Sequence, residues 1–170
     1  FVASTAEMAL GLLLAVARNI TVSTAEYALG RVPAQRTGRQ LRGGTAGIIG
    51  YGAIGTHLAD LLVAIGMEVL VHDPFAADPR VDGVRFVGFE ELLSAADVVF
   101  PLAPGSPDTE NLIGAPELAL MRRGSLLINV SRGELLDDVA VAEALGSGHL
   151  GGLGLDVGRG DDQRPPPPLA

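Results

Sequence analysis

Apolar positions along the chain occur in two kinds of segment. Some are short runs rich in β-branched residues, as in strands that are buried on both faces, and others carry apolar residues at helical spacing. The predicted strands cover residues 45–49, 68–72, 84–87, 97–100, 125–130 and 149–155. The predicted helices cover residues 5–19, 56–65, 90–96, 116–121 and 137–145. Because strands alternate with helices, the pattern predicts an α/β fold with a doubly wound parallel sheet.

The first predicted helix is apolar on nearly all sides. Ser4 to Glu7 have the spacing of a capping box, so the helix is expected from about Thr5 to Asn19. An apolar surface this wide is typical of a helix buried against another domain or subunit. We therefore predict that residues 4–19 form an interdomain or dimer contact and that the full-length protein is a homodimer. Residues 20–44 follow as a long connection, which can be partly helical.

Glycines with the spacing G-x-G-x-x-G, at Gly50, Gly52 and Gly55, lie between the first predicted strand and the next helix. This strand–turn–helix context is the one in which the pattern indicates a dinucleotide site. Gly50 allows a tight turn, Gly52 allows the backbone to approach a pyrophosphate closely, and Gly55 allows the helix to pack closely on the strand. The free N–H groups at the helix start, which include those of Ala53 and Ile54, would receive the phosphate charge. The sequence thus predicts a Rossmann-like, three-layer nucleotide-binding domain.

An acidic residue, Asp73, ends the second predicted strand. Its separation from Gly55 in the sequence is close to the roughly 20 residues at which a carboxylate binds the ribose of adenosine in such domains. A carboxylate accepts hydrogen bonds from the ribose hydroxyls and repels a 2′-phosphate, so the cofactor predicted is NAD rather than NADP. The alternative is that the glycines serve only packing and that Asp73 merely ends a strand.

Composition excludes several other functions. With 170 residues and 48% hydrophobic residues, the chain can form one domain with a core, and its net charge of −8 argues against a nucleic-acid surface. All 12 basic residues are arginine, which excludes Schiff-base lysines and the P-loop lysine. The absence of cysteine excludes thiolate chemistry and makes a cytoplasmic location the default. We predict no metal, because the three histidines are scattered, and no membrane span, because the longest apolar run is too short.

Polar or turn-forming residues follow the predicted strands at Gly50, Asp73, Pro104, Arg132 and Asp156. In a doubly wound sheet, ligands bind outside the carboxyl ends of the strands. We therefore expect these residues to lie around one site.

In their order, these motifs resemble those of the NAD-binding domain of the D-isomer-specific 2-hydroxyacid dehydrogenases. The glycine pattern and the His72-Asp73-Pro74 turn are followed by a P-x-S-P-x-T loop at residues 104–109 and an N-x-S-R-G element at residues 129–133. An S-G-H-L-G motif at residues 147–151 and L-D-V at residues 155–157 complete the match, which covers nearly the whole chain. The resemblance implies NAD, a small 2-hydroxy or 2-oxo acid, and reversible hydride transfer between them.

The resemblance also implies roles for single residues. Arg132 corresponds to the residue that binds the substrate carboxylate, to which a planar guanidinium is suited. Asp156 corresponds to the acid that holds the nicotinamide carboxamide. Asp161 stands in place of a glutamate that orients the catalytic histidine, and it is one methylene shorter. The remaining cofactor-binding positions that the resemblance implies are Pro104, Thr109, Val130 and Ser131.

Each catalytic assignment has a structural alternative. Arg132 can cap a neighbouring helix or loop, Asp156 can be an exposed acid after a strand, and Asp161 can belong to a disordered acidic tail. The catalytic histidine that the resemblance implies would lie after Ala170, and the histidines present are interpreted as structural. The missing histidine, together with a first residue, Phe1, that is not methionine, favours a piece of a longer protein. We expect this piece to bind NAD but to show no turnover, and the substrate domain to come from flanking residues.

Two other functions remain open from the sequence. One is a non-catalytic NAD-sensing module, because the same family includes a transcriptional corepressor. The other is a different Rossmann protein, such as an NAD-dependent hydrolase or an S-adenosylmethionine methyltransferase. Phosphite or formate oxidation, as in relatives of the family, is a further variant of the enzyme interpretation.

Overall fold

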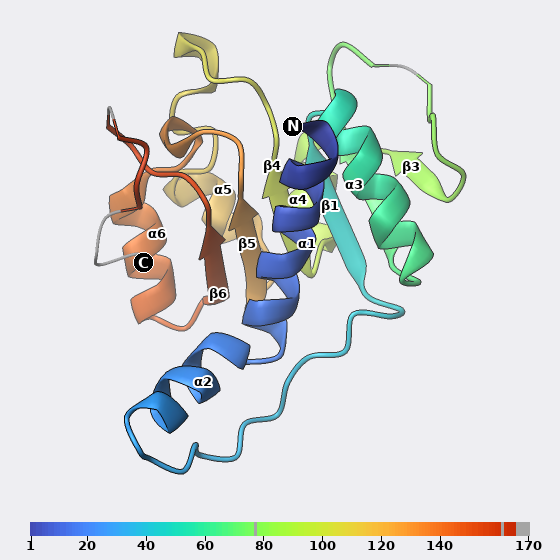
Figure 1. Ribbon diagram of the computed structural model, residues 1–170. Coiled ribbons are helices and arrows are strands. Elements are labelled where there is room, and N and C mark those ends of the chain that lie inside the picture. Colours follow the sequence, from blue (N-terminus) through green and yellow to red (C-terminus); the bar gives the residue numbers. More distant parts are fainter. Residues whose placement is uncertain (77, 161, 166–170) are drawn as a thin grey trace.

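The computed structural model describes residues 1–76, 78–160 and 162–165. Its six strands form one parallel sheet in the order β3-β2-β1-β4-β5-β6 (Figure 1). The strands are β1 (Thr45–Ile49), β2 (Glu68–His72), β3 (Val84–Phe86), β4 (Val98–Pro101), β5 (Ser125–Asn129) and β6 (Leu150–Leu155). The α-helices are α1 (Val2–Ala17), α2 (Ile20–Ala28), α3 (Ala53–Ala64), α4 (Phe89–Ala95), α5 (Ala115–Leu120) and α6 (Asp138–Gly146), and the short 3-10 helices are η1 (Pro107–Thr109) and η2 (Gly133–Leu135).

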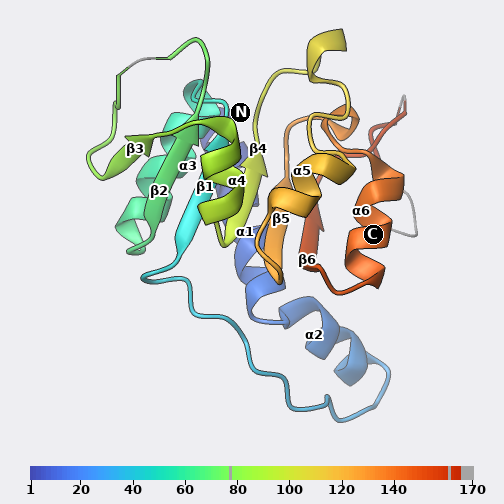
Figure 2. The same cartoon turned by 180° about the vertical axis from the view of Figure 1, so that it is seen from behind.

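Helices cover both faces of the sheet and make a three-layer domain. Helices α1 and α3 lie on one face, and α4, α5 and α6 lie on the other, as the opposite view shows (Figure 2). Neighbouring residues of one strand serve the two layers: Ile48 packs in the cluster that contains α1 and α3, whereas Ile49 packs in the cluster of α4, α5 and α6. The predicted fold class, a doubly wound parallel sheet, is therefore confirmed.

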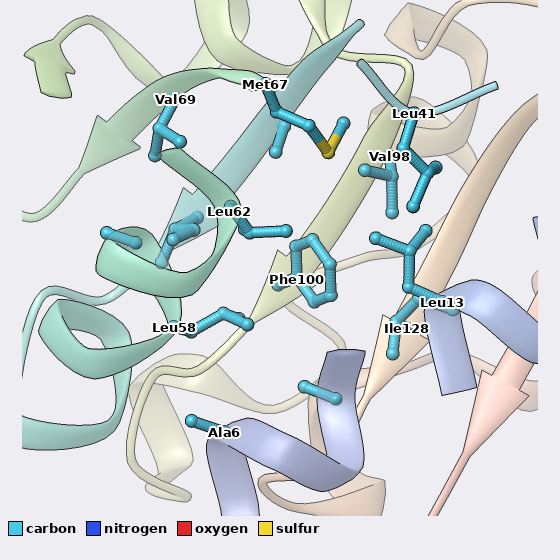
Figure 3. Close-up of a cluster of buried hydrophobic side chains, with 14 of the residues drawn as sticks. Ala6, Leu13, Leu41, Leu58, Leu62, Met67, Val69, Val98, Phe100 and Ile128 are labelled. Carbon is cyan, nitrogen blue, oxygen red and sulfur yellow. The ribbon is translucent and has the colours of Figure 1, made fainter. Parts of the chain in front are cut away.

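The core between α1, α3 and the sheet is built from side chains that are fully shielded from solvent. Leu58 and Leu62 of α3 and Leu13 of α1 meet Phe100 and Ile128 from the centre of the sheet (Figure 3). Burying a large aliphatic or aromatic side chain of this kind contributes about 1.5–3 kcal/mol. This cluster fixes the start of α3 over β1, where the glycine turn lies.

The strand order reverses next to β1, which pairs with β2 on one side and with β4 on the other. In doubly wound sheets the crevice at such a reversal, outside the carboxyl ends of the strands, is the place where ligands bind. The topology thus places the candidate site at the carboxyl ends of β1, β2 and β4.

Most predicted boundaries agree with the structure to within about three residues, but the cap predicted for the first helix differs. Helix α1 already begins at Val2, and the hydroxyls of Ser4 and Thr5 both donate to the carbonyl oxygen of Phe1 at 2.9 Å. The capping box predicted from Ser4 is therefore wrong, because its hydroxyl bonds backwards within the first turn. The helix ends before Asn19, whose left-handed backbone, with φ of 57°, bends the chain by 68° into α2.

Helix α1 buries one face against its own domain. Ala6, Ala9, Leu13 and Ala17 are buried at helical spacing, and the helix contacts α3, β5 and β6. Much of its apolar character is thus explained within this domain, while α2 has no buried residue. Within the described ranges 1–76, 78–160 and 162–165, no single helix is long and apolar enough to cross a membrane, although α1 and α2 together pass this test by length and composition.

Candidate nucleotide and substrate site

The glycine turn after β1 is shaped by two close backbone approaches. Gly50 has a φ of 104°, and its N–H donates to the carbonyl oxygen of His72 at 2.9 Å. A Cβ at Gly50 would lie 2.9 Å from the backbone of Leu102, and one at Gly55 would lie 2.2 Å from the carbonyl oxygen of Gly50. Both positions therefore require glycine for the turn and for the packing of α3 on β1.

Gly52 differs from the other two glycines because the space beside it is open. A Cβ there would meet no atom of the described residues within 4 Å. Gly52 is the N-cap of α3 without a side-chain cap, so the first N–H groups of this helix lack partners within the helix. Open space in front of free N–H groups at a helix start fits a phosphate. The turn thus fits the pyrophosphate of a dinucleotide.

Asp73, at the end of β2, is bound to the same turn. Its Oδ2 accepts a hydrogen bond from the N–H of Tyr51 at 2.6 Å, and its Oδ1 accepts one from the N–H of Phe75 at 2.8 Å. Tyr51 is buried, and its ring packs edge-on against Phe86 at 5.3 Å. The backbone therefore fixes the orientation of the carboxylate. Because each carboxylate oxygen has two acceptor positions, Asp73 can still accept from ribose hydroxyls.

A cleft of about 410 Å³ opens between the carboxyl ends of β1 and β2 and the loop after β4. It brings together four of the predicted residues, Gly50, Asp73, Pro104 and Thr109. The other residues that line it are Ile49, His72, Pro74, Phe75, Phe89, Ala103, Ser106, Asp108 and Leu112. A mostly apolar slot with one fixed acid has the chemistry to bind an aromatic base and its ribose.

The loop that closes this cleft is organised by Thr109. Its hydroxyl donates to the carbonyl oxygen of Pro104 at 2.7 Å and accepts from the N–H of Ser106 at 2.9 Å. The P-x-S-P-x-T pattern is thus explained as a local hydrogen-bonded loop. A contact of Thr109 with a cofactor stays a prediction.

The loop after β5 carries Arg132 and is held by Asn129, which is fully buried. The side chain of Asn129 accepts from the N–H of Ser131 at 3.0 Å and donates to the carbonyl oxygen of Arg132 at 2.8 Å. The Ser131 hydroxyl donates to the carbonyl oxygen of Ala103 at 3.0 Å and so joins this loop to the loop after β4. Asn129 is a site residue that sequence reasoning missed, although the N-x-S-R-G motif contains it.

Arg132 is exposed, and its Nη1 donates to the carbonyl oxygen of Ser131 at 2.7 Å. It lines a second hollow of about 360 Å³ with Gly105, Ser106, Pro107, Glu110, Glu134 and Gln163. Ser106 lines both this hollow and the cleft beside Asp73, so the two adjoin along one loop. A guanidinium beside the end of a nucleotide cleft has the geometry to bind an anion there.

Asp156 follows β6, which lies next to β5 in the sheet. Its side chain is exposed, and its N–H donates to the carbonyl oxygen of Asn129 at 3.0 Å. The structure thus places Asp156 and Arg132 at the ends of neighbouring strands, as predicted. Val130, which follows Asn129 in the chain, is buried. Asp161 lies outside the described residues.

A family model decides which proteins this domain belongs with. The model of the family described as "D-isomer specific 2-hydroxyacid dehydrogenase, NAD binding domain" matches residues 10–170. The chain belongs to this family. The alternative of an unrelated Rossmann protein is therefore excluded. Membership of this family explains the order of the motifs along the chain, which runs from the glycine turn and Asp73 to the Arg132 loop and Asp156.

The chain is similar to several members of the family. It is 36% identical over 169 residues to a D-3-phosphoglycerate dehydrogenase from Archaeoglobus fulgidus, a match that covers 98% of the chain and 32% of that protein. It is 44% identical over 117 residues to a glycerate dehydrogenase from Methylorubrum extorquens, covering 69% of the chain and 35% of that protein. The chain thus spans about a third of the curated relatives that it matches.

Solved structures of the family have the same fold. A glyoxylate reductase from Paecilomyes thermophila superposes with a TM-score of 0.92 at 33% identity, over 99% of this chain and 52% of that one. A D-lactate dehydrogenase from Aquifex aeolicus, solved with NAD and lactic acid, has a TM-score of 0.85 at 30% identity, over 92% and 48% of the two chains.

Two histidines of this D-2-hydroxyacid dehydrogenase domain lie close to backbone carbonyls. His149 Nε2 lies 2.8 Å from the carbonyl oxygen of Leu118, and His72 Nδ1 lies 3.2 Å from that of Val87. His72 also lines the cleft beside Asp73, so the structural interpretation of the histidines stays a prediction. Among the residues that the structure describes, no group of three or more acidic or histidine side chains could hold a metal ion.

Proposed function

We propose that this chain is the NAD-binding part of an enzyme that interconverts a small 2-hydroxy acid and the corresponding 2-oxo acid. The observation that carries the proposal is the adjacency of the two hollows. The cleft with Asp73 and the hollow with Arg132 share Ser106 and the loop after β4. A dinucleotide that entered the cleft with its adenosine would therefore extend toward the arginine.

The fit of the residues supports NAD as the cofactor. The N–H groups at Ala53 and Ile54 would bind the pyrophosphate, and Asp73 would bind the adenosine ribose and repel a 2′-phosphate. Asp156 would hold the nicotinamide carboxamide. The loop residues that would line the remainder of the site are Pro104, Thr109, Val130 and Ser131. When bound, NAD accepts or supplies the hydride of the reaction.

Arg132 would bind the carboxylate of the acid. A guanidinium has five N–H donors in a fixed fork, and in the described part of the chain one hydrogen bond, to Ser131, engages the side chain. The remaining donors can bind a carboxylate in bidentate fashion. We propose that the hydroxyl proton is moved by a histidine from flanking sequence, oriented by Asp161, and that a substrate domain from flanking sequence closes over the site.

The test measures turnover of the full-length protein with NADH and a panel of 2-oxo acids. Phosphite and formate are tested separately with NAD. We expect reduction of at least one short 2-oxo acid. Arg132→Ala should lower kcat/KM about 100-fold, because it removes hydrogen bonds to a charged group, while the NADH dissociation constant stays within about twofold. Arg132→Lys should restore only part of the activity, since an ammonium is a point charge without the fork.

Arg85→Ala is the control, because Arg85 lies on the edge strand β3 in an exposed ion pair with Glu91. If the intact protein binds NADH but turns over none of these substrates, the NAD-sensing interpretation replaces the enzyme. If Arg132→Ala leaves turnover unchanged, Arg132 does not bind the substrate.

We also propose that the full-length protein is a homodimer joined through α1 and α2. Apolar side chains remain exposed on and after these helices, namely Met8, Leu14, Ile20, Val22, Tyr27, Leu29 and Val32. Contiguous exposed apolar surface is characteristic of an interface. Sedimentation at high protein concentration tests this proposal, and a well-behaved monomer would contradict it.

A further inference from the structure

Arg159 joins three segments of chain around the Arg132 hollow. It lies in the turn after β6, and its side chain is 31% exposed. Nε donates to the carbonyl oxygen of Leu136 at 3.1 Å, and Nη2 donates to that of Glu134 at 3.1 Å. Nη2 also contacts the carbonyl of Leu136 and the side-chain oxygen of Asn111, and Nη1 lies 3.4 Å from a carboxylate oxygen of Glu110.

The carbonyls that Arg159 binds belong to the loop that begins at Arg132. Arg132 is the N-cap of η2, and Glu134 lies within this helix. The loop also pairs with residues 111–113: the N–H of Asn111 donates to the carbonyl oxygen of Glu134 at 2.8 Å, and the N–H of Ile113 donates to that of Leu135 at 2.9 Å. Arg159 and the N–H of Asn111 thus donate to the same carbonyl oxygen, that of Glu134, so the turn after β6 and residues 111–113 hold the Arg132 loop together.

The turn after β6 also touches this loop directly. A Cβ at Gly133 would lie 2.1 Å from the backbone carbon of Gly158, so the two backbones are in contact. The N–H of Gly158 donates to the carbonyl oxygen of Gln163 at 2.7 Å, and Gln163 lines the Arg132 hollow. The backbone contact and the arginine fork together fix the distance between the loop of Arg132 and the loop that follows Asp156.

We infer that Arg159 is a positioning residue that holds the Arg132 loop against the loop after Asp156. The inference rests on the proposed function, in which Arg132 binds the acid and Asp156 the nicotinamide. An arginine is suited to this task because its rigid fork serves several carbonyls at once, whereas a lysine offers a single ammonium. The effect on turnover follows because catalysis is sensitive to displacements of about 1 Å in a residue that positions the substrate.

The test compares Arg159→Ala and Arg159→Lys in the full-length enzyme, with Arg85→Ala as the control. We expect Arg159→Ala to lower kcat/KM for the 2-oxo acid about tenfold and Arg159→Lys to lower it about threefold, with an NADH dissociation constant within about twofold of the unmodified enzyme. Amide exchange at Ile113 and Leu136 should be about tenfold faster in Arg159→Ala, because the carbonyls of this loop lose their common partner. Arg85→Ala should change none of these quantities.

A double-mutant cycle separates positioning from general stability. If Arg159 acts through Arg132, Arg159→Ala should change kcat/KM by less than about twofold in an Arg132→Ala background, because the group that it positions is already gone. An equal loss in both backgrounds would overturn the inference, as would unchanged exchange at Ile113 and Leu136. If the unmodified protein reduces no 2-oxo acid, the proposed function fails, and the exchange measurement alone then decides whether Arg159 holds the loop.

Discussion

The N–H of Tyr51, between the first two glycines of the turn, donates to Oδ2 of Asp73 at 2.6 Å. The acid that ends β2 is thus bound to the turn that ends β1. Oδ1 accepts from Phe75 at 2.8 Å, so both oxygens of the carboxylate are oriented by the backbone. A carboxylate that is fixed before the ligand arrives loses less conformational entropy on binding.

We predict that Asp73→Ala weakens NAD binding by roughly 1.5–3 kcal/mol, because charged hydrogen bonds are lost, and reduces the discrimination against NADP. Asp73→Asn keeps one side-chain oxygen as acceptor and removes the charge that repels a 2′-phosphate, although its Nδ2 gives up one of the two backbone hydrogen bonds that orient the carboxylate. It should retain more NAD affinity than Asp73→Ala and lose a similar share of the discrimination. Calorimetric titration with both cofactors measures this. An unchanged NAD/NADP preference in both variants would remove Asp73 from the ribose site.

The glycines Gly52 and Gly55 should respond differently to the same substitution. Gly55→Ala would place a Cβ 2.2 Å from the carbonyl oxygen of Gly50, and we expect it to lower the free energy of unfolding by about 1–3 kcal/mol. Gly52→Ala meets no described atom within 4 Å and should cost at most about 1 kcal/mol as an N-cap change, yet it should weaken NAD binding by occupying the space before the free N–H groups. Urea unfolding and NAD titration of both variants check this; equal loss of stability would contradict it.

The sequence predicted the sheet and the nucleotide turn well because both are encoded locally. Buried parallel strands are continuous apolar runs, and the φ of Gly50 and the close approach at Gly55 demand glycine at fixed spacing. The capping box of α1 was predicted wrongly because a hydroxyl such as that of Ser4 can bond backwards to Phe1 as well as cap a helix forward.

Long-range contacts of the site were beyond prediction from local pattern. Arg159 contacts residues more than 20 positions earlier in the chain, and no periodicity or motif pointed to it. Asn129 was visible in a motif, but its burial and its two hydrogen bonds to the Arg132 loop depend on the packing of the whole sheet edge. Sequence reasoning therefore found the residues that would touch ligands more readily than the residues that hold them.

We predict different effects on stability when two buried polar side chains of β5 are replaced by alanine. Asn129→Ala leaves the N–H of Ser131 and the carbonyl of Arg132 without their partner and should destabilise the protein by about 1–3 kcal/mol. Ser125→Ala is the matched control: the Ser125 hydroxyl is buried without a hydrogen-bond partner among the described residues, so removing it should leave stability unchanged or raise it. Thermal unfolding of both variants measures this. A loss in Ser125→Ala equal to that in Asn129→Ala would contradict it.

The last prediction concerns the ion pair that fastens α2 to the connection after it. Arg36 donates to both carboxylate oxygens of Glu26, at 2.8 and 3.2 Å. These hydrogen bonds hold the pKa of Glu26 below its ordinary value of 4.5. Because the folded-state pKa is lowered, the contribution of the pair is present above pH 4.5 and is lost as the pH falls through the folded-state value.

We therefore expect the amides of α2 to lose protection from hydrogen exchange as the pH falls below 4.5, relative to those of α3 in the core. The effect should be small, because the pair is exposed to solvent, and it should weaken further in high salt. Glu26→Gln cannot titrate and should show the same low protection above and below pH 4.5. If the unmodified protein and Glu26→Gln respond alike to pH, the pair does not fasten α2.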